Sequence, residues 1–497
     1  MKKMSQIKIG WSEVDITPNK KISLAGQFFE RISDEVESRL YAIATAVESD
    51  GEVMVLCALD LVSVSDNLYR IVKERFEAAT GVSGDKVILS AIHTHTSYTY
   101  GRESNLAMPS AKKAIEALMP EDMKYVPLVS GEESMDPDEA LEIIANGAAT
   151  ACINAYNSRK EGYYKNAFGR VAVGMCRRVC YDDGSAKMWG DTNHPNFTEL
   201  EGGNDSGMEL IFTFDNNKKL TGVIANIACP SQVVEHRSFI SSDYWGKVRE
   251  NIKKKYGDDV AVLGLCSAAG DQCPRDMIRW VNPESPIDDP NIKRDAYIER
   301  VADPSMFDLS GLRLVGRRIS NEIISVFEEL DENYVREAPL IHKTLTVTMP
   351  LRRVTISEYN EAIGKIQDFI DKNRGKKISF EENAMLHIYS GTITRYEMQK
   401  TVNTYEDEIH IIRLGDVAIA TNPYELFLDY GNKIRARSYA KQTFLIQLAC
   451  GSCGYLPTEK AEKGSHYSAY VSSGRTGHEG GDLLVRTTLE TINKMFK

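Results

Sequence analysis

The chain of 497 residues has an ordinary globular composition, with 42% hydrophobic and 26% charged residues. This composition excludes a collagen-like repeat and an intrinsically disordered chain. Sixty Lys and Arg residues against 71 Asp and Glu residues give a formal net charge of −11. A net acidic chain has no general attraction for nucleic acid or for anionic lipid, so we expect neither as a partner. No apolar run reaches the roughly 18 residues that a membrane span needs.

The N-terminus and the cysteines both predict a cytoplasmic protein. The first 18 residues contain three lysines but lack the apolar stretch of a secretory signal peptide. Nine cysteines are scattered over the chain, and an odd number in a large chain is not typical of a secreted disulfide framework. We therefore expect mostly buried, reduced thiols.

Short apolar runs alternate along the chain with amphipathic stretches of helical period. The apolar runs predict buried strands at 53–59, 87–92, 210–214, 222–227, 260–265, 411–420 and 444–448. Asp136, Pro137 and Glu139 together form a helix start, which predicts a helix that runs to about Asn157. Further helices are expected near 67–79, 244–256, 311–330, 357–373, 426–437 and 483–495. This alternation predicts an α/β fold with a mixed β-sheet core flanked by helices. Because no linker interrupts the pattern, the sequence favours a single large core or two interleaved subdomains over separate domains.

The first candidate site follows the strand at 87–92, which runs into His93-Thr-His95. Side chains two residues apart lie on the same side of a strand, so both imidazoles should project together from its end. Such pairs present imidazoles to metal ions, although a hydrogen-bonded histidine pair has the same spacing. The motif alone leaves both interpretations open.

Two further strand ends carry a cysteine. The strand at 260–265 leads through small residues to Gly270, Asp271 and Cys273, and small residues let the backbone approach a ligand closely. Cys273 is therefore a candidate nucleophile, ligand or polar contact, or an inert thiol in a tight turn. Cys229, which follows the strand at 222–227, is a potential soft ligand.

The C-terminal quarter of the chain adds an acid and a cysteine pair. Glu425 follows a strand and a turn at a predicted helix start, where an acid also complements the helix dipole. Cys450 and Cys453 have the Cys-x-x-Cys spacing of redox and zinc motifs. No thioredoxin-like unit and no second pair at zinc-finger spacing accompanies them, so the sequence does not favour either role.

In chain order, these segments resemble the neutral (alkaline, non-lysosomal) ceramidase family over nearly the whole chain. The resemblance rests on Val14-Asp-Ile-Thr-Pro18, Leu24-Ala-Gly26, His93-Thr-His95, Gly270-Asp271-x-Cys273-Pro274, the strand leading to Glu425, and Gly454-Tyr455 with Pro457-Thr458. It implies the family's catalytic-domain fold, a single zinc ion and an activated water that hydrolyses an N-acyl amide. The family's C-terminal immunoglobulin-like domain has no counterpart before Lys497, so we expect none.

The resemblance also implies roles for individual residues. His93, Glu425 and Tyr455 would be metal ligands, and Cys229 stands where the family has its second histidine ligand. His95 would stabilise the oxyanion or move a proton. Arg177 would contact a substrate oxygen, with Arg178 as the alternative. Cys273 replaces the serine of the family's hexapeptide.

These implications predict a zinc-dependent hydrolase that cleaves an amide bond in a small or soluble substrate. Zinc accepts thiolate as readily as imidazole, so Zn²⁺ remains the expected cofactor with Cys229 in the ligand set. Two alternatives stay open. One is a non-catalytic relative that binds a ligand beside a degenerate metal site, and the other is a metal-free cysteine hydrolase in which His95 activates Cys273.

Overall fold

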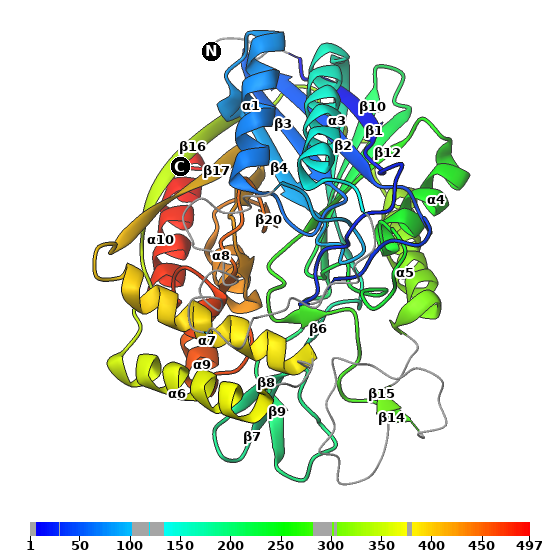
Figure 1. Cartoon of the computed structure of the whole chain (residues 1–497). Helices are drawn as coiled ribbons and strands as arrows, with labels where there is room; N and C mark the ends of the chain where they lie inside the picture. The colour runs from blue at the N-terminus through cyan, green and yellow to red at the C-terminus, as the bar shows by residue number, and fades with distance from the viewer. Residues whose placement is uncertain are drawn as a thin grey trace.

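An eight-stranded mixed sheet forms the centre of the computed structural model, which describes residues 6–28, 30–101, 119, 134–281, 301–302, 306–374 and 380–497 (Figure 1). The strand order is β12-β11-β10-β5-β1-β2-β3-β4, with parallel pairing in β3–β4 and β11–β12 and antiparallel pairing elsewhere. β12 also contacts β2, β3 and β4, so the sheet curls until its two ends approach each other. In chain order, the strands are β1 (Lys8–Asp15), β2 (Tyr41–Ser49), β3 (Glu52–Leu59), β4 (Val87–Ala91), β5 (Lys160–Arg170), β10 (Gly207–Asp215), β11 (Leu220–Ile227) and β12 (Ala261–Cys266).

Two pairs of helices pack on this sheet. α1 (Asp66–Thr80) and α3 (Pro137–Asn157) contact each other, and α3 packs on β1, β2 and β3 (Figure 1). α4 (Tyr244–Tyr256) and α5 (Asp308–Glu328) form the second pair, which reaches β12 through α4 and β5 through α5. Their apolar faces join the sheet in one large hydrophobic core.

A four-stranded sheet in the order β16-β17-β18-β20 packs beside the large one, because β20 contacts β10, β11 and β12. Its strands are β16 (Leu340–Pro350), β17 (Thr404–Leu414), β18 (Val417–Thr421) and β20 (Gln442–Ile446). α10 (His478–Met495) packs on β16 and β17 and contacts α8 (Leu428–Arg437), while α6 (Ile356–Asn373) and α7 (Phe380–Met398) pack on each other.

The remaining elements are short. They are the strands β6 (Met175–Cys176), β7 (Arg178–Tyr181), β8 (Ala186–Met188), β9 (Phe197–Leu200), β13 (Gln272–Cys273), β14 (Trp280–Val281), β15 (Val301–Ala302), β19 (Glu425–Leu426) and β21 (Tyr455–Leu456), the helix α9 (Glu459–Gly464), and the single 3₁₀ turns η1 (Gly84–Lys86) and η3 (Val471–Ser473).

The structure confirms the predicted α/β class and every predicted helix, with small differences at their ends. α3 begins as expected, because the Asp136 side chain accepts a hydrogen bond from the Asp138 amide. The run at 411–420 was predicted as one strand but forms β17 and β18, which are joined by a tight turn in which Gly415 has a φ of +58°. No helix among the described residues is long and apolar enough to cross a membrane.

A buried ion pair joins α4 to the end of β3. Asp60 is 1% exposed and Arg249 is 7% exposed, and the two guanidinium ends of Arg249 each donate to one carboxylate oxygen of Asp60. The Tyr41 amide donates a third hydrogen bond to this carboxylate, at 2.9 Å. Because both charges are buried, each depends on the other for its stability.

We expect Asp60→Asn to lower the free energy of unfolding by about 3–5 kcal/mol, since it leaves the Arg249 guanidinium buried without its counter-charge. Urea-induced unfolding followed by circular dichroism measures this loss. Glu139→Gln is the matched control, because it removes an exposed ion pair with Lys20 and should cost less than about 1 kcal/mol. Equal effects of the two substitutions would show that the buried pair has no special role.

Candidate active site

The candidate site lies where strands from both sheets end. His93 and His95 follow β4, and Gln232 and Glu235 follow β11. Arg177 lies between β6 and β7, close to the chain that leaves β12. Crevices at the carboxyl ends of strands are the usual binding sites of open α/β sheets.

The two histidines meet through a turn. β4 already ends at Ala91, and His93 adopts a left-handed φ of +65°. The rings of His93 and His95 pack edge to face with centroids 4.8 Å apart, and their Nε2 atoms are 3.3 Å apart. Both histidines follow the end of the strand, as predicted. Their imidazoles come together because of the turn at His93, and not because side chains alternate along a strand.

Hydrogen bonds fix which nitrogen of each ring carries the proton. His93 Nδ1 lies 2.6 Å from the Val62 carbonyl oxygen, which can only accept, so this nitrogen is the donor. His95 Nδ1 lies 3.1 Å from Glu235 Oε2, while the Gln232 amide donates to His95 Nε2 at 2.8 Å. The His95 Nε2 lone pair therefore accepts from Gln232, whereas the His93 Nε2 lone pair is directed into the site, as in metal centres whose histidines donate Nδ1–H to a carbonyl.

Glu425 and Tyr455 reach the same point from the opposite wall. They are direct partners in the parallel pair β19–β21, so their side chains lie next to each other, and the Tyr455 hydroxyl hydrogen-bonds the carboxylate. Glu425 Oε2 is 3.3 Å from His93 Nε2. Although burial raises the pKa of Glu425, His93, Arg177 and Tyr455 outweigh it and hold the pKa below its usual range. The site therefore contains a buried carboxylate.

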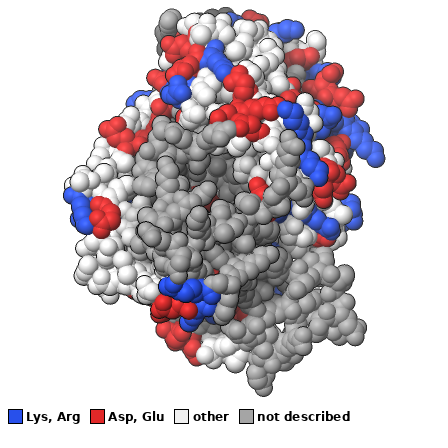
Figure 2. Space-filling model, viewed as in Figure 1, with Lys and Arg blue, Asp and Glu red and all other residues white. Residues whose placement is uncertain are grey.

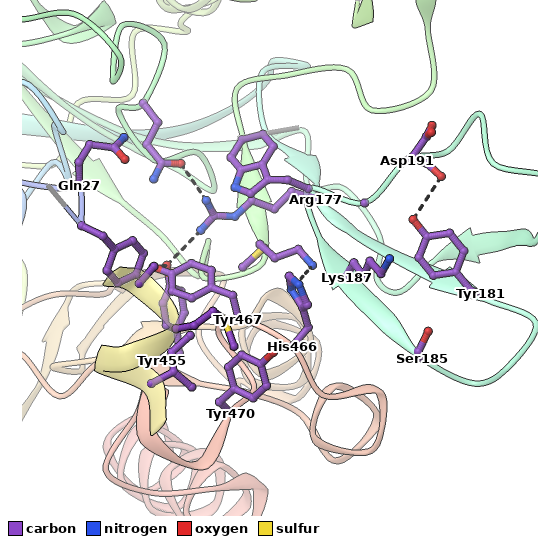
Figure 3. A pocket seen from close by; sticks show the side chains of 18 of the residues that line it. Gln27, Arg177, Tyr181, Ser185, Lys187, Asp191, Tyr455, His466, Tyr467 and Tyr470 are labelled. Carbon is purple, nitrogen blue, oxygen red and sulfur yellow. Dashed lines mark hydrogen bonds between the residues drawn. The ribbon is translucent and has the colours of Figure 1, made fainter. Parts of the chain in front are cut away.

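Arg177 supplies the positive charge of the site. Its guanidinium donates to Gln232 Oε1 at 3.2 Å, to the Gly270 carbonyl at 3.2 Å and to the Tyr455 hydroxyl at 3.4 Å (Figure 3). Burial lowers its pKa, but the charges of neighbours that include Tyr455 raise it above the usual range, so Arg177 stays protonated. The alternative, Arg178, instead forms a two-pronged ion pair with Glu201.

The two cysteines singled out in the sequence face backbone carbonyls. The Cys229 thiol donates to the carbonyls of Val173 and Pro230 at 3.5 and 3.6 Å. Burial raises its pKa well above the usual value. Among the contacts of the described residues, none joins this thiol to His93 or Glu425. Its position does not support the predicted role of Cys229 as a metal ligand.

Cys273 lies in β13, and its thiol donates to the Arg275 carbonyl at 3.5 Å. Burial raises its pKa to about 12, even though the charges of Arg177 and Arg275 act in the opposite direction. A thiol that stays protonated at neutral pH is a poor nucleophile, so this environment does not favour a cysteine hydrolase.

Sequence reasoning missed three polar residues of the site. Gln232 and Glu235 bind His95, and the Tyr467 hydroxyl lies 3.2 Å from that of Tyr455. Gln232 and Glu235 come three and six residues after Cys229. Their position directly after an apolar strand was a usable signal, because polar residues at a buried strand end commonly line a site.

The donors can be tested against the geometry of zinc. In the part of the chain that the structure describes, no three His, Cys, Asp or Glu side chains form a group arranged to hold a metal ion. His93 and Glu425 do, however, converge with the Tyr455 hydroxyl, an oxygen donor outside those residue types. Tetrahedral zinc with bonds of about 2.0–2.1 Å places neighbouring donors about 3.3–3.4 Å apart. The 3.3 Å between His93 Nε2 and Glu425 Oε2 matches this edge. Three protein donors with one open position are typical of catalytic zinc, so these residues fit the ion.

A cavity of about 450 Å³ lies beside this group. Of the three donors Tyr455 lines it, together with His95 and Arg177. Figure 3 shows aromatic and polar side chains from several segments around it. The outer part includes Tyr181, Lys187, Trp189, Tyr467 and Tyr470. This volume is in the range of small-molecule sites.

Comparisons with known proteins support the fold. No family model matches the sequence, and no curated protein matches it either. Among solved structures, the chain is similar to the neutral ceramidase from Pseudomonas aeruginosa, with a TM-score of 0.67 at 15% identity. A structure of a ceramidase complexed with C2 matches with a TM-score of 0.66 at 14% identity. Each match covers 99% of this chain and 75% of the other. The chain therefore has the neutral ceramidase fold.

Gly26 packs directly against the imidazole ring of His95. It has a φ of +93°, and a Cβ atom there would lie 2.6 Å from His95 Cγ. We expect Gly26→Ala to displace the imidazole and to raise the rate at which diethyl pyrocarbonate modifies His95 several-fold, measured by peptide mass spectrometry. Gly51→Ala is the matched control, since Gly51 also has a positive φ (+83°) but has nothing within 4 Å of the added carbon. An unchanged rate in Gly26→Ala would contradict this view of the site.

Proposed function

We propose that the protein is a zinc-dependent hydrolase that cleaves an amide bond in a small or soluble substrate by metal-activated water. The proposal includes one catalytic domain over residues 1–497. The observation that carries it is the convergence of His93 Nε2, the Glu425 carboxylate and the Tyr455 hydroxyl beside the buried charge of Arg177, where Tyr455 and Arg177 line a cavity.

His93, Glu425 and Tyr455 would hold the zinc ion. When bound, zinc supplies a Lewis acid that acidifies a water molecule and polarises a carbonyl. The Val62 carbonyl keeps the proton of His93 on Nδ1, so that Nε2 is free to bind. The charge of Arg177 lowers the pKa of the Glu425 carboxyl and so keeps this ligand ionised.

The remaining polar groups suit the chemistry of amide hydrolysis. Arg177 lines the cavity and offers a fixed positive charge to the oxyanion that develops on an attacked carbonyl. His95 lies beside the ligands, and its proton-accepting Nε2 makes it the group to pass a proton to the leaving amine. Glu235 holds the ring of His95 in place. Burial lowers the pKa of His95 more than the neighbouring Glu235 raises it, so the imidazole is neutral at neutral pH and ready to accept a proton.

The surface and the cysteines fit a cytoplasmic enzyme of a small substrate. Acidic and basic side chains are interspersed on the face shown in Figure 2, around α1 and α3. All nine cysteines are free thiols, which supports a reducing compartment such as the cytoplasm.

The ligand set can be tested by metal content. We expect wild-type protein purified without added zinc to contain about one zinc per chain, as a three-donor site implies. His93→Ala and Glu425→Gln should lose most of it, because each removes one donor. Cys229→Ser is the matched control and should keep the metal. Inductively coupled plasma mass spectrometry measures the zinc content. Loss of zinc in Cys229→Ser would show that Cys229 is a metal ligand after all.

The catalytic role of Arg177 predicts a selective loss of turnover. We expect Arg177→Met to lower kcat on N-acyl substrates roughly 10²–10³-fold, as for removal of an oxyanion donor, while the zinc content stays unchanged. Release of the free amine measures turnover before and after chelation. Cys273→Ala should retain activity, because its thiol is not used. Loss of activity in Cys273→Ala together with turnover that resists chelators would favour the cysteine hydrolase instead.

A further inference from the structure

A second cavity, of about 710 Å³, lies between α1, β17 and the loop that carries Cys450 and Cys453. Its walls include Tyr69 and Lys73 of α1 and Glu408 of β17. None of the groups assigned to the active site lines it. The Cys-x-x-Cys motif, which the proposed function does not use, therefore opens into a separate cavity.

The Cys450 thiol is held at the wall of this cavity by its backbone. The Cys450 amide donates to the Leu89 carbonyl at 2.8 Å, and the preceding residue pairs with Ser90. Cys450 has a left-handed φ of +62°, which the contacts to β4 impose. The side chain is 7% exposed, and its thiol donates to the Leu89 carbonyl at 3.8 Å. It lies close enough to Tyr69 and His410 to raise the pKa of both. Cys453, in contrast, donates to Asp407 at 3.4 Å, so the two cysteines have different partners.

A chain of hydrogen bonds places protons on both nitrogens of His410. His342 Nδ1 lies 3.2 Å from the Val53 carbonyl, which can only accept, so His342 Nε2 accepts from His410 Nδ1 at 2.9 Å. On the other side of the ring, His410 Nε2 lies 3.1 Å from Glu408 Oε1, and the Tyr69 hydroxyl donates to this same oxygen at 2.6 Å.

The pKa shifts of His410 and Glu408 agree with these hydrogen bonds. Burial alone would lower the pKa of His410, but the neighbouring Cys450 and Glu408 raise it to about 9. Glu408 has a pKa of about 2, because hydrogen bonds from His410 and Tyr69 outweigh its burial. His410 is therefore an imidazolium at neutral pH, and a cation beside a thiol is the environment that makes cysteines reactive.

We propose that Cys450 is a reactive thiol that forms a mixed disulfide with a small organic disulfide bound in this cavity. The Cys450 sulfur bonds to one sulfur of the disulfide and the bond between the two disulfide sulfurs breaks. The other half leaves as a thiolate and takes up the proton that Cys450 gave up. Cys450 is thereby oxidised and the small disulfide is reduced, so no further reactant is needed. Glu408 is a positioning residue, which acts through His410.

Wild-type protein tests the proposal with oxidised glutathione as the probe. Non-reducing peptide mapping over time gives the rate of adduct formation at each cysteine. We expect Cys450 to react roughly tenfold faster than Cys180, because reactivity follows the cationic environment. Cys180 is more exposed and lacks an imidazole among its described partners. Faster or equal reaction at Cys180 would show that exposure alone decides and would overturn the proposal.

Two variants on β17 distinguish the effect of Glu408 and His410 on Cys450 from the effect of the overall charge of the cavity. Glu408→Gln removes the carboxylate that holds His410 and should slow adduct formation at Cys450 several-fold. Glu406→Gln removes a charge from the same cavity two residues away and should leave the rate unchanged. Circular dichroism confirms that both variants are folded. Equal rates of adduct formation in the two variants would show that Glu408 and His410 do not make Cys450 reactive.

Discussion

The buried guanidinium of Arg31 holds together the loops from which the candidate active site is built. It donates to the backbone carbonyls of Ala25, His95 and Glu235 at 2.6 Å each, and to that of Arg237 at 2.7 Å. Burial lowers its pKa to about 10, partly offset by the charge of Glu235, so it remains protonated at neutral pH. A single charged side chain thus joins the N-terminal loop to the loops after β4 and β11. The relative position of His95 and Glu235 follows from this junction.

The opposite wall is fixed by backbone contact instead of by charge. Glu425 and Tyr455 are neighbours because β19 and β21 pair in parallel. Gly270 packs directly against this pair, since a Cβ atom there would lie 2.3 Å from the Glu425 carbonyl oxygen. Arg177 then connects the walls through Gln232 on one side and Tyr455 on the other. The side chains of His93, Glu425 and Tyr455 are therefore oriented by contacts within the chain itself, and a site oriented in advance binds its ligand at a low cost in ordering.

The sequence predicted the elements of this site better than their orientation. His93 and Glu425 stand out because each follows an apolar strand, and strand ends are where such sites form. Tyr455 follows no apolar run, and only the resemblance to the ceramidase family identifies it. The direction of the Cys229 thiol depends on the path of the loop that follows β11, and no local pattern encodes that path. The same holds for Glu235, whose partner His95 is distant in the chain. The turn at Gly415 was missed because apolar residues on both sides of it continue one hydrophobic run.

The same distinction explains how a neutral ceramidase fold can persist at 15% identity. Several contacts that hold the loops of the site in place are made to backbone atoms, as those of Arg31 are made to carbonyls. Gly474 provides another example, because a Cβ atom there would lie 1.9 Å from the Tyr455 carbonyl oxygen. Contacts of this kind constrain the path of the chain and leave most side chains free to change. Cys229 and Cys273 fit this view, since each thiol is bonded to a backbone carbonyl that any chain following this path would present. A substitution at such a position changes the side chain while the loops around it keep their course.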